Sequence, residues 1–297
     1  RLYTSWCHDH YNLGADYDKD GVLDAYVVNG WKLEGDRVLE VGRHVLYRGR
    51  GDGTFEDVTR KAGVSGDGQW GAGVAVADYD DDGWPDLLVT SFGRNLLYRN
   101  RGDGTFDNVA PELGLEVSGW NTGAAFLDAN GDGALDLYVS AYIDCSVGDV
   151  LEARRDLSWK GVEQVAFGPF GLPGAPDHFF LADGSGGFQE ATEASQLEDR
   201  GLAFGFTVRA ADFDADGRLD LYVANDSDAN NLYRSNGDGT FADMTLWCGA
   251  AFDALGAAQA GMGVAVGDMD GDQVLDLFVT NFAEDFSTLY RGMSGGL

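Results

Sequence analysis

Five short stretches of the sequence place oxygen-bearing side chains on alternate residues, and these side chains are suited to bind a cation. Each follows the pattern Asp-x-Asp/Asn-x-Asp-Gly-x-x-Asp, with Gln in place of Gly in the fifth. A hard cation such as Ca²⁺ takes about six to eight oxygen ligands, which alternating carboxylates on a curled backbone supply. We number the loop positions 1 to 9 and expect side-chain ligands at 1, 3, 5 and 9 and a carbonyl ligand at 7. The predicted ligands are Asp16, Asp18, Asp20, Val22 and Asp24 in loop 1; Asp78, Asp80, Asp82, Trp84 and Asp86 in loop 2; Asp128, Asn130, Asp132, Ala134 and Asp136 in loop 3; Asp212, Asp214, Asp216, Arg218 and Asp220 in loop 4; and Asp268, Asp270, Asp272, Val274 and Asp276 in loop 5.

The loops differ from a helix-flanked calcium site, because they end in Asp at position 9 and run directly into a β-type stretch. Position 6 needs a positive φ, which Gly adopts freely and which Gln273 must accept at a cost of about 1 kcal/mol. Asn130 supplies an amide oxygen, so loop 3 carries less negative charge. Carboxylates this close repel one another unless a cation lies between them. The sequence therefore predicts about five bound Ca²⁺ ions.

The elements that position these loops repeat along the chain. A strand of small residues such as Gly71–Ala77 precedes a loop, and an apolar run such as Leu87–Thr90 follows it. A third strand with Leu-Tyr-Arg and a Gly-Asp-Gly-Thr-Phe turn into a fourth strand complete most units. Four short strands per repeat are typical of a β-propeller blade. We predict an all-β fold, a single propeller domain over residues 1–297, with units at about 6–64, 69–115, 119–197, 201–250 and 257–297.

The number of blades stays open. Residues 1–5 could supply the outer strand that the fifth unit lacks and close a five-bladed ring, or the five units could form part of a seven-bladed one. An insertion at 141–178 separates the second and third strands of the third unit, and Val150–Trp159 could form a short helix inside it. This insertion either carries an individual binding function or covers an exposed blade edge.

Composition excludes several classes of function. Fifty acidic and 20 basic residues give a formal net charge of −30, which argues against binding to nucleic acid or anionic lipid. No apolar run reaches the roughly 20 residues of a membrane-spanning helix, and no signal peptide is visible. Cys7, Cys145 and Cys248 allow one bridge and a free thiol, or three thiols. Calcium loops favour a secreted, cell-surface or periplasmic location.

The motifs resemble the FG-GAP/VCBS repeats, the calcium-binding blades also found in integrin α-chains. More narrowly, the chain is similar to the ASPIC/UnbV-associated, cartilage-acidic-protein-like family. The segments that carry this resemblance are Ala224-Asn-Asp-Ser227, Gln259–Asp268, Val279–Phe282 and the Gly168–Asp177 part of the insertion. The resemblance implies an extracellular calcium-stiffened propeller used in adhesion or matrix interactions. Ala166–Pro169 replaces a Tyr-Cys-Gly-Pro element of the family, which puts a disulfide there in doubt, and the ASPIC/UnbV module itself is absent.

Other motifs have simpler interpretations. Arg50-Gly51-Asp52 and Arg101-Gly102-Asp103 match an integrin-recognition tripeptide but belong to the repeated turn. Asn225-Asp-Ser227 is a formal glycosylation sequon at the exit of a strand. The cluster Cys7-His8-Asp9-His10 could hold a soft metal, although ordinary strand or turn residues explain it as well.

Catalytic motifs are missing: the sequence has no Gly-x-Ser-x-Gly, phosphate-binding loop or His-Glu-x-x-His. We therefore expect no enzyme and no catalytic or organic-cofactor residues. The favoured hypothesis is a calcium-binding structural, adhesion or protein-interaction module whose rim or insertion binds a protein partner or a second copy. One rival is a glycan-binding propeller, and another is a calcium-dependent carbohydrate- or phosphoester-active enzyme. Candidate sugar-stacking residues for the first rival are Trp31, Trp70, Trp84, Trp120 and Trp159.

Overall fold

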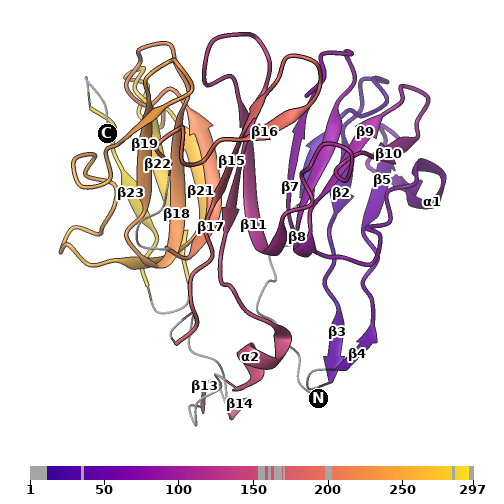
Figure 1. The fold of residues 1–297 in the computed structure, drawn as a ribbon, viewed down its shortest axis with the longest axis horizontal. Helices are drawn as coiled ribbons and strands as arrows, with labels where there is room; N and C mark the ends of the chain where they lie inside the picture. The colour runs from indigo at the N-terminus through magenta and orange to yellow at the C-terminus, as the bar shows by residue number, and fades with distance from the viewer. Residues whose placement is uncertain are drawn as a thin grey trace.

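The protein folds into antiparallel blades that follow one another in a β-propeller, and backbone pairing joins blade 2 to blade 3 and blade 4 to blade 5 in larger sheets (Figure 1). The computed structural model describes residues 12–34, 37–152, 158–159, 162–163, 169, 171–197, 203–282 and 285–293.

Blade 1 consists of β1 (Asn12–Ala15), β2 (Asp24–Val27), β5 (Val45–Gly49) and β6 (Phe55–Asp57). Blade 2 consists of β7 (Trp70–Ala77), β8 (Asp86–Arg94), β9 (Leu96–Asn100) and β10 (Phe106–Asn108). Blade 3 consists of β11 (Ser118–Leu127), β12 (Asp136–Ala141), β15 (His178–Ala182) and β16 (Phe188–Glu190). Blade 4 consists of β17 (Gly205–Ala211), β18 (Asp220–Asp228), β19 (Asn231–Ser235) and β20 (Phe241–Asp243). In blade 5 the described strands are β21 (Gln259–Gly267), β22 (Asp276–Asn281) and β23 (Thr288–Tyr290).

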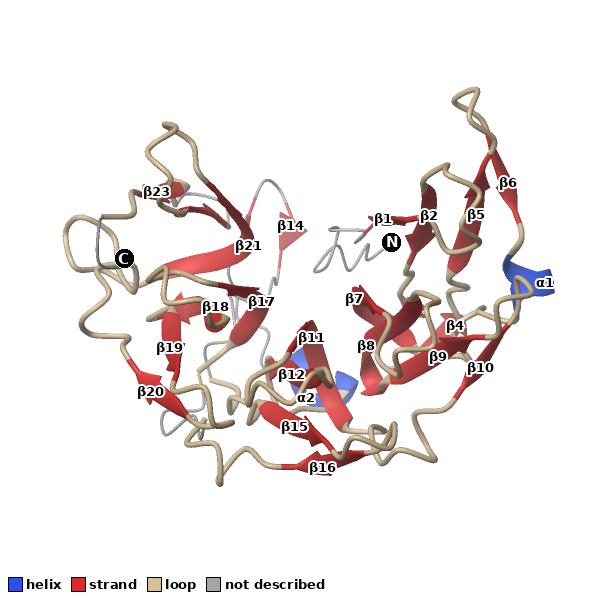
Figure 2. Ribbon diagram, turned by 90° about the horizontal axis from the view of Figure 1, so that it is seen from above, coloured by secondary structure: helices blue, strands red, loops and turns tan. Residues whose placement is uncertain are grey.

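The strands of small residues lie nearest the centre of the propeller. Figure 2 shows β7, β11, β17 and β21 around the middle of the molecule, with β10, β16 and β20 at the periphery. Neighbouring backbones approach closely there: a Cβ atom added to Gly73 would lie 2.2 Å from the Thr122 carbonyl oxygen of the next blade. At Gly73 even the methyl group of Ala would therefore push the two strands apart.

The hydrophobic core lies between blades. Successive residues of a strand point to opposite faces, so the apolar second strands serve two interfaces each. Leu87 and Val89 of β8 pack toward blade 1, whereas Leu88 packs toward blade 3. Leu221 of β18 packs toward blade 3 and Tyr222 toward blade 5. This double burial explains why the second strands read as continuous apolar runs.

All five metal loops lie at one end of the blades. Each loop joins the first strand to the second, and the antiparallel pairing places the turn between the third and fourth strands at the same end. Connections from the second to the third strand lie at the opposite end, the lower one in Figure 1. There the hairpin of β3 (Lys32–Glu34) and β4 (Arg37–Glu40) and the insertion of blade 3 project from the sheets.

The insertion separates β12 from β15, as expected, but the predicted helix was misplaced. The helix α2 covers Val147–Glu152, and Ser158–Trp159 forms a strand, β13, paired with β14 (Val162–Glu163). Ser146 caps α2, because its hydroxyl accepts the Asp149 N–H at 3.3 Å while the Asp149 carboxylate accepts the Ser146 N–H at 2.7 Å. Val150 and Leu172 pack against a cluster of Trp120, Tyr142 and Phe206. The described part of the insertion thus covers apolar side chains at the lower end of the inner strands.

The blades follow an arc in Figure 2, with blade 1 and blade 5 at its ends. Over the described residues, no strand of blade 1 pairs with a strand of blade 5. Residues 1–5 lie outside the described residues, so the predicted strand exchange and the blade number stay predictions. A short helix, α1 (Thr59–Ala62), follows β6. None of the helices in the described ranges is long and apolar enough to span a membrane.

Candidate metal centres

Each loop is curled by two left-handed residues. Position 6 has φ values of 84° at Gly21, 90° at Gly83 and 69° at Gln273, which confirms the positive φ expected there. Position 4 is also left-handed, with φ of 57° at Lys19 and 60° at Ala215, a feature that the sequence pattern did not reveal. The two turns fold the backbone so that the side chains at positions 1, 3 and 9 point inward.

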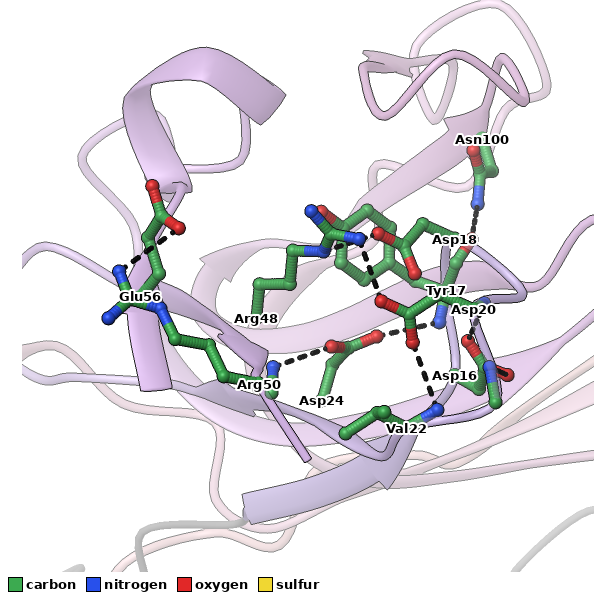
Figure 3. Close-up of polar contacts among 12 residues, drawn as sticks. Asp16, Tyr17, Asp18, Asp20, Val22, Asp24, Arg48, Arg50, Glu56 and Asn100 are labelled. Carbon is green, nitrogen blue, oxygen red and sulfur yellow. Dashed lines mark hydrogen bonds and ion pairs between the residues drawn. The ribbon is translucent and has the colours of Figure 1, made fainter. Parts of the chain in front are cut away.

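The inward carboxylates converge in four loops. In each, carboxylate oxygens from positions 1, 3 and 9 lie within 4.8 Å of one another. Figure 3 shows this arrangement in loop 1. The four triads are Asp16, Asp18 and Asp24; Asp78, Asp80 and Asp86; Asp212, Asp214 and Asp220; and Asp268, Asp270 and Asp276. In loop 3 the side chain at position 3 is Asn130, so that loop has no such carboxylate triad.

The position 1 carboxylate organises the curl by accepting backbone N–H groups with both oxygens. Asp16 accepts the N–H of Asp20 at 3.0 Å and of Gly21 at 2.9 Å. Asp78 makes the matching bonds to Asp82 and Gly83, at 3.0 and 2.8 Å. These bonds leave the other oxygen lone pairs available to a cation and fix where the carboxylate lies before a cation binds.

The position 9 carboxylate has a second role, which sequence reasoning missed. One oxygen of Asp86 accepts the Tyr79 N–H at 3.1 Å, and the other accepts the Asn100 N–H of the third strand at 2.7 Å. All five loops repeat this pair of bonds. The side chain that would bind the ion therefore also joins the loop to the third strand of its blade.

Burial makes the position 9 carboxylates difficult to ionise. Loss of solvation, with a smaller contribution from the nearby loop carboxylates, raises the pKa of Asp86 to about 7 and that of Asp220 to about 6. The pKa of Asp276 is instead lowered, because the N–H groups of Met269 and Gly292 stabilise its charged form and no described blade follows blade 5. A cation at each loop would offset the cost of ionising the buried groups.

Two buried oxygen atoms test whether a metal fits. Oδ1 of Asp18 and Oδ1 of Asp80, both at position 3, are shielded from solvent and have no hydrogen-bond partner. Buried acceptors are almost always satisfied, and a cation coordinated by positions 1, 3 and 9 would satisfy these two. The donors are all oxygens, which suits Ca²⁺ and not a soft transition metal.

Positions 5 and 7 lie at the outer side of each loop. The position 5 carboxylate accepts the N–H of position 7, from Val22 to Asp20 at 2.9 Å and from Trp84 to Asp82 at 2.8 Å. The same bond occurs from Ala134 to Asp132, from Arg218 to Asp216 and from Val274 to Asp272. Position 5 completes none of the convergent triads, and ligation by it and by the position 7 carbonyls stays a prediction.

The metal loops contact their neighbours through polar groups that sequence patterns did not reveal. Lys19 of loop 1 lies 4.5 Å from the ring centre of Trp84 in loop 2, and its ammonium donates to the Gly83 carbonyl. Asn100 of blade 2 is buried and donates to the Tyr17 carbonyl of loop 1 at 2.9 Å. Loops 1 and 2 are thereby physically linked.

The remaining motifs have local structural roles. Asp52 and Asp103 of the two Arg-Gly-Asp segments accept hydrogen bonds from Thr54 and Thr105 within their turns. The Asn225 amide is buried and donates to the Ala229 carbonyl at 2.5 Å and to Asn231 at 2.6 Å, which leaves no room for a glycan. Cys145 and Cys248 are free thiols, and Cys7 to His10 lie outside the described residues.

Three of the tryptophans proposed as sugar platforms, Trp31, Trp70 and Trp120, pack against other aromatic rings. Trp70 contacts Trp31, Phe92 and Trp120, and Trp84 is covered by Lys19. The side chain of Trp159 lies outside the described residues. A more exposed tryptophan, Trp247, is 81% accessible and was not among the candidates.

The fold and the repeated acidic loops define a β-propeller in which four of the described loops bring three carboxylates together as a candidate cation site. A model of the FG-GAP-like repeat matches residues 16–89, 78–139 and 212–279, and the chain belongs to this family. Human cartilage acidic protein 1 is 27% identical over 88% of the chain, and the Xenopus tropicalis protein is 27% identical over 76%. The chain spans only 36% and 31% of the length of these two relatives.

Among solved structures, an Agrocybe aegerita lectin described as recognising non-reducing terminal N-acetylglucosamine aligns with 91% of the chain and 60% of the lectin. Its identity is 19% and the TM-score is 0.49. The Vibrio cholerae biofilm matrix protein Bap1 aligns at 16% identity with a TM-score of 0.39, over 91% of this chain and 34% of Bap1. Likeness at this level carries no conclusion about ligands.

Proposed function

We propose that this protein is a non-enzymatic, extracellular calcium-binding β-propeller that serves as a structural, adhesion or protein-interaction module. The observation that carries the proposal is the convergence of carboxylates at positions 1, 3 and 9, with a buried unpartnered oxygen at position 3 in loops 1 and 2. Calcium is the cation that matches these hard ligands, and its millimolar supply outside cells favours that location. Relationship to cartilage acidic protein 1 is compatible with the same assignment.

The mechanism is rigidification. A cation at position 9 carboxylates such as Asp86 would favour the ionised form, which accepts N–H groups from both the loop and the third strand. Ion binding would therefore stabilise the pairing of the second and third strands. The surface held in place is the upper rim, where the loops and the turns between third and fourth strands lie together. We infer that this rim or the insertion of blade 3 contacts a protein partner or a second copy.

The test compares thermal unfolding with calcium and with excess EGTA. Each site at a hundredfold excess of calcium over Kd adds about 2.7 kcal/mol to the free energy of unfolding, so a large rise in Tm is expected. Asp18→Ala, in the loop 1 triad, should reduce this calcium-dependent rise. Asp52→Ala removes a carboxylate from the adjacent turn and should leave it unchanged. Equal Tm in calcium and EGTA for the wild-type protein would refute structural calcium binding.

A glycan array separates the lectin alternative from this proposal. With Trp70 and Trp120 packed against other aromatic rings, we expect no signal. Specific glycan binding that is lost on changing an exposed residue such as Trp247 would instead favour a lectin.

A further inference from the structure

Two arginines reach the metal loops from the third strands of their blades. The Arg48 guanidinium places Nε 2.7 Å from Oδ2 of Asp18, as an ion pair without hydrogen-bond alignment, and donates through Nη2 to Oδ2 of Asp20 at 2.7 Å (Figure 3). Arg291 lies 2.6 Å from Asp270 and 3.2 Å from Asp272 in loop 5. In both loops one arginine pairs with the carboxylates of positions 3 and 5.

Strand register explains how the arginine reaches the loop. Tyr47 pairs with Ala25, so Arg48 stands beside Asp24 at position 9. In loop 3 the register pairs Phe180 with Leu137, so an apolar residue, Leu181, takes the place of the arginine. The third strands of the other four blades carry arginine at this place, namely Arg48, Arg99, Arg234 and Arg291.

The loop without this arginine is also the loop with one carboxylate fewer. In loop 3 Asn130 stands at position 3, and its amide donates to Oδ2 of Asp132 at 2.9 Å. This bond reaches the same position 5 oxygen that Arg48 and Arg291 reach in loops 1 and 5. In loop 4 the guanidinium of Arg218 contacts Oδ2 of Asp216. A side-chain donor therefore contacts the position 5 carboxylate in loops 1, 3, 4 and 5. Among these four loops, the donor is an arginine in the three loops where position 3 is Asp.

We propose that Arg48 and Arg291 are resident counter-ions of loops 1 and 5. Each holds the position 3 and 5 carboxylates together when no metal is bound, and each lowers the calcium affinity of its own loop. Without a cation, the carboxylates of the triad repel one another, and the guanidinium offsets this repulsion. A bound Ca²⁺ adds two positive charges beside the guanidinium, so the residue that stabilises the metal-free loop opposes the ion. This inference rests on the proposed calcium binding.

The experiment compares Arg48→Met with the wild-type protein, because Met keeps the apolar stem and removes the charge. Tm in excess EGTA should fall by about 1–2 °C, because the ion pair is partly exposed to solvent. Competition with a fluorescent calcium chelator at low ionic strength should show one binding constant strengthened about tenfold, the scale expected for a unit charge near a divalent ion in water. Arg48→Lys, which keeps the charge, should change the calcium affinity less than threefold.

Arg234→Met is the matched control. Arg234 has the same place in blade 4, but over the described residues no ion pair joins it to loop 4, where Arg218 contacts the position 5 carboxylate. Its removal should leave both Tm in EGTA and calcium affinity close to wild type. If Arg48→Met does not fold, Arg291→Met provides the same comparison at loop 5.

The outcomes separate the two proposals. Calcium binding by the wild-type protein with unchanged affinity and unchanged Tm in Arg48→Met and Arg291→Met would overturn the counter-ion role and leave the proposed function intact. Weaker calcium binding in both variants would show that the arginines assist the ion, which also overturns it. A wild-type protein that binds no calcium would refute the proposed function together with the affinity effect.

Discussion

The close approach of inner strands makes Gly73 a sensitive test of the propeller arrangement. A Cβ atom at this residue would lie 2.2 Å from the Thr122 carbonyl oxygen of blade 3 and 2.7 Å from Oγ1 of Thr90. The Thr90 hydroxyl donates to the same carbonyl at 2.8 Å. Gly73→Ala must therefore push β7 away from β11 or break the hydrogen bond that joins blades 2 and 3.

The expected cost combines two effects. Overpacking in a filled interior costs about 1–3 kcal/mol, and a buried carbonyl left without its donor costs about 1–3 kcal/mol. We expect the free energy of unfolding to fall by about 4 kcal/mol. With an unfolding entropy of about 2.1 cal/mol/K per residue, this corresponds to a fall in Tm of roughly 6 °C for a chain of this length.

Thermal and urea unfolding in saturating calcium would measure this effect, with Gly267→Ala as the control. Gly267 also lies in an inner strand, but no atom is within 4 Å of its added Cβ. The control should be neutral or stabilising by up to about 1 kcal/mol, because Ala reduces the freedom of the unfolded chain. If Gly73→Ala is as mild as Gly267→Ala, then the inner strands do not approach one another as described.

Four further variants test other parts of the structure. His44 is fully buried, and desolvation lowers its pKa to about 4. The free energy of unfolding should therefore fall by up to about 3 kcal/mol as the pH drops from about 6.5 to 4. His44→Phe should remove this pH dependence in urea titrations with saturating calcium. Asn100→Ala leaves the Tyr17 carbonyl without its donor and should cost about 2 kcal/mol in urea unfolding, and chelator competition should show weaker binding at one loop. Gly217→Gln should lower the free energy of unfolding by about 1 kcal/mol, because φ is 88° at this position. Gln273→Gly, at φ 69°, should change the stability by less than about 0.5 kcal/mol, since relieved strain and added entropy of the unfolded chain oppose each other. Thermal unfolding measures both effects.

The repeated pattern was sufficient to predict the blades and the loops, because the same local chemistry recurs at every blade. The apolar run Leu87–Val89 predicted a strand, although only the structure shows which residue faces which blade. The helix of the insertion was misplaced because the prediction used apolar periodicity and did not take the N-terminal capping residues into account. The Ser146 and Asp149 pair was visible in the sequence and marks the start correctly.

Long-range contacts were beyond sequence reasoning. The position 9 Asp was identified as a ligand from its spacing, but its bond to the third strand depends on a residue such as Asn100, 14 positions later in the chain. The contact of Lys19 with Trp84 joins residues that are 65 positions apart and depends on how blade 1 packs on blade 2. Neither residue type has a preference that would reveal such a pairing.

The two ends of the blades depend on different forces, and under the proposed function this division determines where calcium would act. At the upper end, position 9 carboxylates such as Asp86 are buried and have a raised pKa, although each accepts hydrogen bonds from two backbone N–H groups. At the lower end, Trp120 packs edge to face on Tyr142 and at a tilt on Trp70. The insertion covers Trp120 and Tyr142, and these apolar contacts need no ion. In a chain of formal net charge −30, repulsion between carboxylates is strongest in the loops, where the acidic side chains are concentrated. Calcium would therefore stabilise the upper rim selectively, and a partner that contacts this rim would bind a surface whose order depends on the ion.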